Sequence, residues 1–178
     1  MSSQVEPEFR RFVPLDEIEE AGVVARAIDA REEERSALAR RFGLLSLGAL
    51  SADVTLRRLP GGPLVRVDGR LVADVEQRCV ISLDPVADHI DEEFSETFGP
   101  EGYVPPEETD EEDLPETFDP GGIDIGELVA QHLALSLNPY PKSPGAETAA
   151  IRRESPETGD EERRRPFAGL GEMLKKRR

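Results

Sequence analysis

The chain has 178 residues, enough for about one domain of ordinary size with some length left for tails. Hydrophobic residues make up 37% and aromatic residues only 5% of it, which predicts a small aliphatic core and some disordered stretches. A formal net charge of -16 argues against general nucleic-acid binding by the folded part, because phosphate contacts need clustered Lys and Arg. The charge favours basic partners, or binding through one locally basic segment.

Two further properties predict a cytoplasmic protein without a membrane segment. No apolar run approaches the roughly 20 residues that cross a bilayer, and the start MSSQVEPEFRRF lacks the apolar stretch of a secretory signal. The single cysteine, Cys79, cannot form an internal disulfide, which fits a reducing compartment.

The start of the chain predicts short elements ahead of a sheet. Residues up to 12 indicate a lead-in strand or arm, residues 15–20 a helical turn, and Val23–Asp29 a strand. The segment Arg31–Gly43 is rich in helix formers, acidic at its start, basic at its end and closed by a glycine, so it predicts a helix.

Three strands follow, over residues 47–59, 63–83 and 86–98, and they predict the structural core. Residues in the middle segment alternate between two faces, with Leu64, Arg66, Asp68 and Arg70 on one and Val65, Val67 and Val72 on the other. One wet face is typical of an antiparallel sheet.

Residues 91–117 hold many carboxylates, several prolines and no Lys or Arg. Such a stretch buries too little apolar area to offset chain entropy, so we expect a mobile acidic insert at about 99–119 within a domain of residues 1–145. Two roles remain open for the insert. It is either a solvated loop that keeps the protein soluble or a docking site for basic proteins or RNA-bound cations.

The strongest local signal predicts a helix in the segment IDIGELVAQHLALSLNPYP. Asp124 is the expected N-cap, with Glu127 in the capping-box position, and Pro139 ends the helix. One helical face carries Ile125, Leu128, Val129, His132, Leu133 and Leu137. Because this face needs a partner, packing across the sheet gives an α+β domain, with an antiparallel sheet core and a few packed helices.

The end of the chain differs in character. Residues 146–165 predict a disordered charged linker, and residues 166–178 predict a short basic amphipathic tail. The candidate RNA- or partner-binding residues are Arg163, Arg164, Arg165, Lys175, Lys176, Arg177 and Arg178 for phosphate contacts, with Phe167, Leu170 and Leu174 as apolar anchors. Whether this tail docks on a partner or packs on its own domain remains open.

No constellation of residues predicts catalysis or metal binding. The two histidines, His89 and His132, are far apart in the sequence, and His132 is interpreted as a core or boundary residue of the helix. Glycine-rich phosphate loops are absent from the sequence, and one cysteine with two separated histidines does not make a tetrahedral zinc site.

The chain carries QRCVISLDPV, then IDIGELVAQHLALSLNPYPKSPGA, and near its end RPFAGLGEML. In this order and separation the blocks resemble the YceD family, also called large ribosomal RNA subunit accumulation protein. The earlier segment ERSALARRFGLLSL is similar to the helix before the sheet in the alphaproteobacterial branch of that family. The residues that match family motifs are Arg78, Cys79, Pro85, Asp124, Gly126, Glu127 and Leu128.

One position departs from the family pattern. Many members carry a second cysteine three residues before the one that matches Cys79, whereas this chain has Glu76 there. Any metal or redox chemistry of such a pair is not expected here, and Cys79 is interpreted as a small residue at a strand.

The resemblance implies a non-catalytic ribosome biogenesis factor that supports the synthesis, processing or stability of 23S rRNA and the assembly of the large subunit. It implies ribosomal proteins or pre-23S rRNA as partners, with no cofactor, no membrane and no small-molecule substrate, and it leaves the oligomeric state open. The alternative is an acidic adaptor or chaperone for a basic ribosomal protein, without direct RNA contact.

Overall fold

The computed structural model describes residues 7–104, 115–118 and 121–146. The chain divides into two units, residues 1–144 and 145–178, and all described helices and strands lie in the first. The expected tail, and all but the first residue of the expected linker, lie outside the described residues. None of the described helices is long and apolar enough to cross a membrane.

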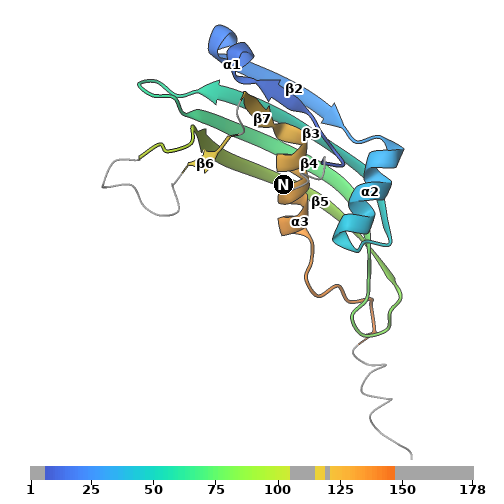
Figure 1. Cartoon of the computed structure of the whole chain (residues 1–178). Helices are drawn as coiled ribbons and strands as arrows, with labels where there is room; N and C mark the ends of the chain where they lie inside the picture. The colour runs from blue at the N-terminus through green and yellow to red at the C-terminus, as the bar shows by residue number, and fades with distance from the viewer. Residues whose placement is uncertain (1–6, 105–114, 119–120, 147–178) are drawn as a thin grey trace, which may run out of the picture. The chain divides into compact units, whose positions relative to one another are not determined.

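The described part is an α+β fold, as the sequence predicts (Figure 1). Its main sheet has five strands in the order β2-β3-β4-β5-β6, and a second sheet pairs β1 with β7. The strands are β1 (Phe12–Pro14), β2 (Val23–Asp29), β3 (Ser46–Arg58), β4 (Val65–Arg78), β5 (Pro85–Gly99), β6 (Glu116–Thr117) and β7 (Gly122–Asp124). The helices are α1 (Leu15–Ala21), α2 (Glu32–Phe42) and α3 (Ile125–Ser136).

β3, β4 and β5 form an antiparallel meander of three long strands. β4 lies in the middle, and its buried residues are Val65, Val67, Leu71, Ala73 and Val75. The expectation that Val72 shares this buried face is wrong. Val72 is half-buried on the opposite face, because the period-two alternation continues unbroken through Gly69.

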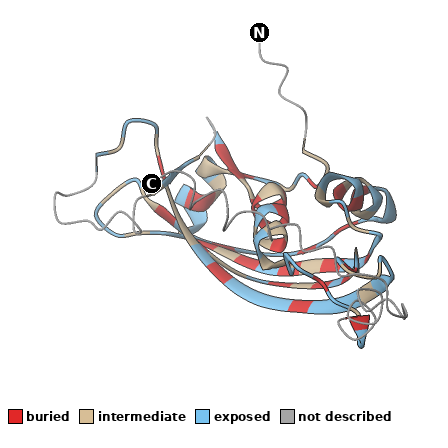
Figure 2. Cartoon of the chain, turned by 90° about the horizontal axis from the view of Figure 1, so that it is seen from below, coloured by how far each residue is buried: buried red, intermediate tan, exposed pale blue. Residues whose placement is uncertain are grey.

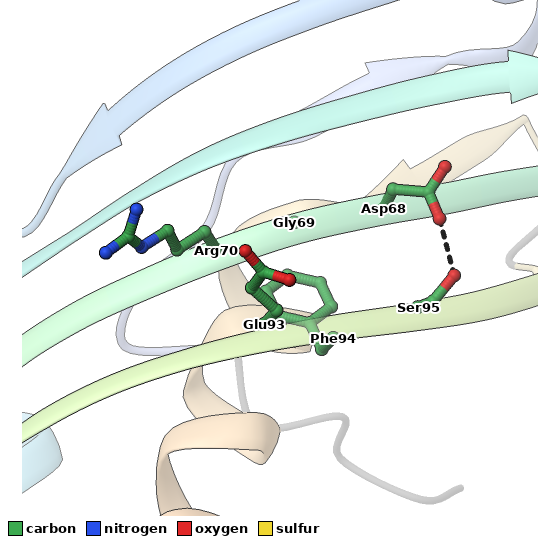
Figure 3. Close-up of a pocket in the computed structure, with 6 residues that line it drawn as sticks. All are labelled: Asp68, Gly69, Arg70, Glu93, Phe94 and Ser95. Carbon is green, nitrogen blue, oxygen red and sulfur yellow. Dashed lines mark hydrogen bonds between the residues drawn. The ribbon is translucent and has the colours of Figure 1, made fainter.

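Gly69 points to the buried face and leaves room there for a side chain of the neighbouring strand. It pairs with Phe94 of β5, and a Cβ at Gly69 would overlap the Phe94 ring. The ring lies beside Gly69 (Figure 3) and stacks on His132 of α3, with 4.3 Å between the ring centroids. The Phe94 ring, packed at this glycine, therefore links β4, β5 and α3.

The helices cover one face of the main sheet and leave the other open (Figure 2). α1 packs against β2 and β3, α2 against β3, and α3 against β4 and β5. Each helix inserts a fully buried aliphatic side chain, Ile18, Leu38 and Leu133 respectively. Full burial of one such side chain stabilises the fold by roughly 1.5–3 kcal/mol, so these three residues anchor the helical layer.

Glu34 of α2 is the one charged side chain that is buried among the described residues. Its two oxygens accept from the Arg11 guanidinium, each at 2.9 Å, and it also accepts from the backbone and side chain of Arg31 at 2.8 Å. These bonds, with Arg11 contributing most, hold the pKa of Glu34 at about 2 although burial raises it. The bond from the Arg31 amide satisfies a backbone donor at the start of α2, and the bonds from Arg11 tie the N-terminal arm, residues 7–14, to that helix.

β6 is an element that the sequence did not predict. It runs parallel to the end of β5, with Phe98 opposite Glu116 and Gly99 opposite Thr117. The amide of Phe118 then donates to the carbonyl of Gly99 at 3.1 Å. The described parts of the expected acidic insert are therefore joined at the sheet, while residues 105–114 and 119–120 lie outside the described residues.

Two of the strand glycines, Gly69 and Gly48, allow a direct test of the Phe94 contact. Gly69→Ala should lower the free energy of unfolding by about 1–3 kcal/mol, because the added methyl overpacks the core. Gly48→Ala should raise it by roughly 0.5–1 kcal/mol, because its Cβ would meet its nearest atoms at 3.7 Å and alanine loses less chain entropy. Urea unfolding of both variants measures the difference, and equal effects would contradict the packing described.

Candidate functional site

The turn between β4 and β5 holds Cys79, so the expectation that this residue belongs to a strand is wrong. β4 ends at Arg78 and β5 begins at Pro85. Between them, the amide of Cys79 donates to the carbonyl of Asp84 at 2.8 Å, and the amide of Leu83 donates to the carbonyl of Cys79 at 3.1 Å. These bonds close the tip of the hairpin around a cysteine that is completely buried.

The segment after α3 covers this turn. The amide of Val80 donates to the carbonyl of Pro141 at 2.9 Å, and the side chain of Gln77 donates to the carbonyl of Asn138 at 3.0 Å. Two blocks of the sequence that resembled a family therefore meet in space, although Gln77 and Asn138 are 61 residues apart in the chain. We call this assembly, residues 77–85 and 138–144, the hairpin-tip clamp.

The sulfur of Cys79 lies at the centre of the hairpin-tip clamp. Its Sγ accepts from the amides of Ile81 and Ser82 at 3.4 Å and of Ser143 at 3.3 Å. The hydroxyl of Ser143 lies 3.5 Å from the same sulfur and 3.0 Å from the hydroxyl of Ser82. Several donors from two separate segments thus converge on one atom.

These donors favour negative charge on the sulfur. The pKa of the Cys79 thiol is lowered to about 6, chiefly by hydrogen bonds from Ser82 and also by those from Ser143, while burial opposes them. A thiolate at neutral pH is reactive when reagents can reach it, but this sulfur is enclosed. Its role in the clamp is to accept hydrogen bonds that hold the turn to the segment after α3.

The outside of the hairpin-tip clamp exposes apolar side chains. Val80 is 49% exposed, Leu83 63% and Tyr140 71%. Among the described residues, Leu83 is also the only one other than glycine with a positive φ, at 67°. A left-handed backbone costs such a residue roughly 1–2 kcal/mol. Because the Leu83 side chain is mostly in water, core packing does not account for this strain, and the tip is a candidate interaction surface.

The second group of motif residues, at the start of α3, holds the N-terminal arm. Asp124 caps the helix by accepting from the amides of Gly126 and Glu127, at 3.1 and 3.3 Å, as the sequence predicts. The same carboxylate accepts from the amide of Arg11 at 2.8 Å. A Cβ at Gly126 would overlap the carbonyl of Phe9, so glycine is required where the arm crosses the helix.

The remaining motif residues of this second group contact other parts of the helical layer and the core. Glu127 does not close the capping box that its spacing predicts. Its carboxylate instead accepts from the Arg41 guanidinium of α2 at 2.7 and 2.9 Å, which lowers the pKa of Glu127. Leu128 is buried in the core. The motif residues of α3 therefore join α3 to the arm, to α2 and to the sheet.

The histidines are arranged for packing and surface pairing. His132 is half-buried against Phe94, and burial lowers its pKa. His89 lies on the open face of the sheet, where its Nδ1 is 2.7 Å from Asp74, and this hydrogen bond raises its pKa. Within the described ranges no group of three or more His, Cys, Asp or Glu is placed to hold a metal ion.

A shallow hollow of about 440 Å³ on the open face is lined by Asp68, Gly69, Arg70, Glu93, Phe94 and Ser95 (Figure 3). Asp68 accepts from Ser95, and Arg70 donates to Asp91 of β5. Because these charged groups already bind one another, the hollow does not indicate a ligand site. The candidate residues of the C-terminal tail, Arg163 to Arg165, Phe167, Leu170, Leu174 and Lys175 to Arg178, lie outside the described residues.

The structure is an α+β domain in which one face of the main sheet is uncovered. Its motif residues bind segments that are far apart in the chain to one another. A family model described as "Large ribosomal RNA subunit accumulation protein YceD" matches residues 67–174, more than half of the chain. The chain therefore belongs to the YceD family. No curated protein and no solved structure matches it. The family match contains both motif groups, and assignment to the alphaproteobacterial branch stays a prediction.

Arg78, Cys79 and Pro85 were among the motif residues of the sequence, whereas the serines that bind the sulfur and the strained Leu83 were not. Ser143 and Cys79 are 64 residues apart, so no local pattern links them. In the sequence, the prolines on either side of Tyr140 indicated only where the preceding helix ends.

The thiol of Cys79 should titrate well below an ordinary cysteine. Ultraviolet absorbance of the thiolate in the folded chain should give a midpoint near pH 6, and Ser143→Ala should raise that midpoint by removing a hydroxyl donor. Because the folded pKa lies below the unfolded value of roughly 8.5, the thiolate adds stability that is full above the unfolded pKa and is lost as pH falls through about 6.

Ser136→Ala is the matched control, because its hydroxyl donates to the carbonyl of His132 and not to sulfur. It should leave the midpoint where it is. A midpoint that Ser143→Ala does not move would show that the clamp does not control the thiol.

Proposed function

We propose that this protein is a non-catalytic assembly factor that supports the synthesis, processing or stability of 23S rRNA by binding components of the large ribosomal subunit in the cytoplasm. The description of its family names the process. The observation that carries the proposal of binding is the hairpin-tip clamp, where motif residues build a fixed turn and three apolar side chains face water.

The exposed side chains of the tip favour a protein partner for the folded domain. Leu83 and Val80 offer no hydrogen bonds to bases or phosphates, whereas exposed apolar residues on a rigid support are typical of protein interfaces. The net charge of -16 also opposes phosphate contacts by the domain. We assign contact with rRNA, or with a ribosomal precursor, to the basic residues from Arg163 onward.

Substitution at the tip separates partner binding from folding. In the double variant Leu83→Gly/Tyr140→Ser, glycine relieves the strain of a left-handed leucine, worth roughly 1 kcal/mol, so stability should hold or rise. A tagged full-length chain should enrich pre-23S rRNA or large-subunit proteins from a bacterial lysate, and the double variant should enrich them several-fold less. Repeating the capture after nuclease treatment reports whether RNA bridges the contact.

Val23→Ser is the control for lost apolar surface, because Val23 is 53% exposed at the end of the sheet away from the tip. It should bind as the unaltered chain does. If the unaltered chain enriches neither class of molecule, the proposed function fails; if the double variant binds equally well, the tip is not the contact.

Truncation before Arg163 tests the role of the basic residues. Loss of RNA or partner capture with an unchanged melting temperature would support docking of this segment on a partner. A lower melting temperature would instead show that the segment packs on its own domain. Capture and calorimetry on the same preparation measure both quantities.

A further inference from the structure

β5 leaves one side of its backbone open. On one side it pairs with β4 from Pro85 to Phe98. On the other side, in the part of the chain that the structure describes, pairing is limited to β6, opposite Phe98 and Gly99. Figure 2 looks at the sheet from this side. A long row of unpaired amides and carbonyls at a sheet edge is a template on which another extended strand can pair.

Carboxylates line this edge on both faces of the sheet. Asp91, Glu92 and Glu93 are consecutive and exposed, so neighbouring ones point to opposite faces. Asp91 is bound to Arg70, and the charge of Glu93, which lies opposite Arg70 in the sheet, also acts on that guanidinium. Neither Glu92 nor Glu93 forms a close ion pair with the basic residues that the structure describes. An added strand would meet negative charge whichever face its side chains took.

This charge selects what the edge can bind. A second copy of β5 would place like charges opposite one another, and RNA would bring phosphates to carboxylates, so both are disfavoured. The other free edge, β2, carries a single carboxylate, Asp29, and has α1 packed beside it. The open edge of β5 therefore differs from the rest of the sheet in both length and charge.

We propose that the open edge of β5 binds an extended basic segment of a protein partner by strand addition. Backbone hydrogen bonds would supply the pairing, and Lys or Arg on the added strand would lie against Glu92 and Glu93. The inference rests on the proposed function in taking a protein as partner, and it names the chemistry of that partner.

The test uses the full chain and a fluorescent peptide of alternating Lys and Thr, about ten residues long, a typical strand length. Anisotropy should show binding that weakens with salt, and hydrogen exchange should slow at the amides of β5. The same peptide with every backbone nitrogen methylated keeps its charge but loses its backbone donors on both edges. It should bind at least about tenfold more weakly, because strand pairing needs those donors.

Matched charge reversals locate the site. Glu92→Lys/Glu93→Lys should weaken binding of the unmethylated peptide by about tenfold or more, because like charges then face each other. Glu19→Lys/Glu20→Lys makes the same charge change at exposed positions of α1 and should have a much smaller effect. Equal binding of the two peptides, equal effects of the two variants, or unchanged exchange at β5 would overturn the proposal.

Failure of this inference is separable from failure of the proposed function. If the unaltered chain captures large-subunit components but the peptide result is negative, only the edge assignment falls. If the peptide binds at β5 but the lysate gives neither pre-23S rRNA nor large-subunit proteins, the edge assignment stands and the proposed process falls.

Discussion

The apolar face of the β3-β4-β5 meander has to be shielded from water, and here it is covered by three helices that are too short to be stable alone. α1 has 7 residues, α2 has 11 and α3 has 12, while isolated helices below about 12–15 residues are marginal in water. They persist because each buries apolar side chains against the strands. The sheet and its cover therefore depend on each other, and neither is expected to form first as a stable unit.

The N-terminal arm links the pieces of this cover. Arg11 binds Glu34 of α2 through its side chain and Asp124, the N-cap of α3, through its amide. Because Arg11 is partly exposed and Arg31 also binds Glu34, removing Arg11 should cost less than the about 3–5 kcal/mol of a fully buried pair whose second charge is left alone. Since Gly126 also lets the arm cross α3 at close range, the start of α3 is a junction of the fold rather than a reaction site.

Covering only one face leaves other parts of the sheet available for partners. The hairpin tip projects beyond the helices (Figure 1), and hydrogen bonds to a buried sulfur hold the backbone that carries exposed side chains such as Leu83. Rigid presentation reduces the entropy lost on binding. The edge of β5 is open for a different reason, because the strand that follows it in the sheet, β6, covers only its last residues.

Most of the elements could be predicted from the sequence, because their signals are local. Alternation predicted the strands, and a cap, a periodic apolar face and a following proline predicted α3 within one or two residues of its observed ends. The sequence also indicated the family, through the order of blocks on either side of the acidic stretch. Position 72 was assigned to the wrong face because Gly69 has no side chain to show which face it belongs to, and the space it leaves is filled by Phe94 from another strand.

The contacts between segments far apart in the chain could not be predicted from the sequence and are set by the packing of the folded chain. Glu127 has the spacing of a capping box, yet a guanidinium from α2 offers two charge-assisted bonds, which are stronger than one bond to a neutral amide. Cys79 lies in a turn and not in the predicted strand, because there its sulfur accepts hydrogen bonds from the turn and from a segment 64 residues away. Such donors are invisible to any local pattern, since they become neighbours only when the sheet and α3 have packed together.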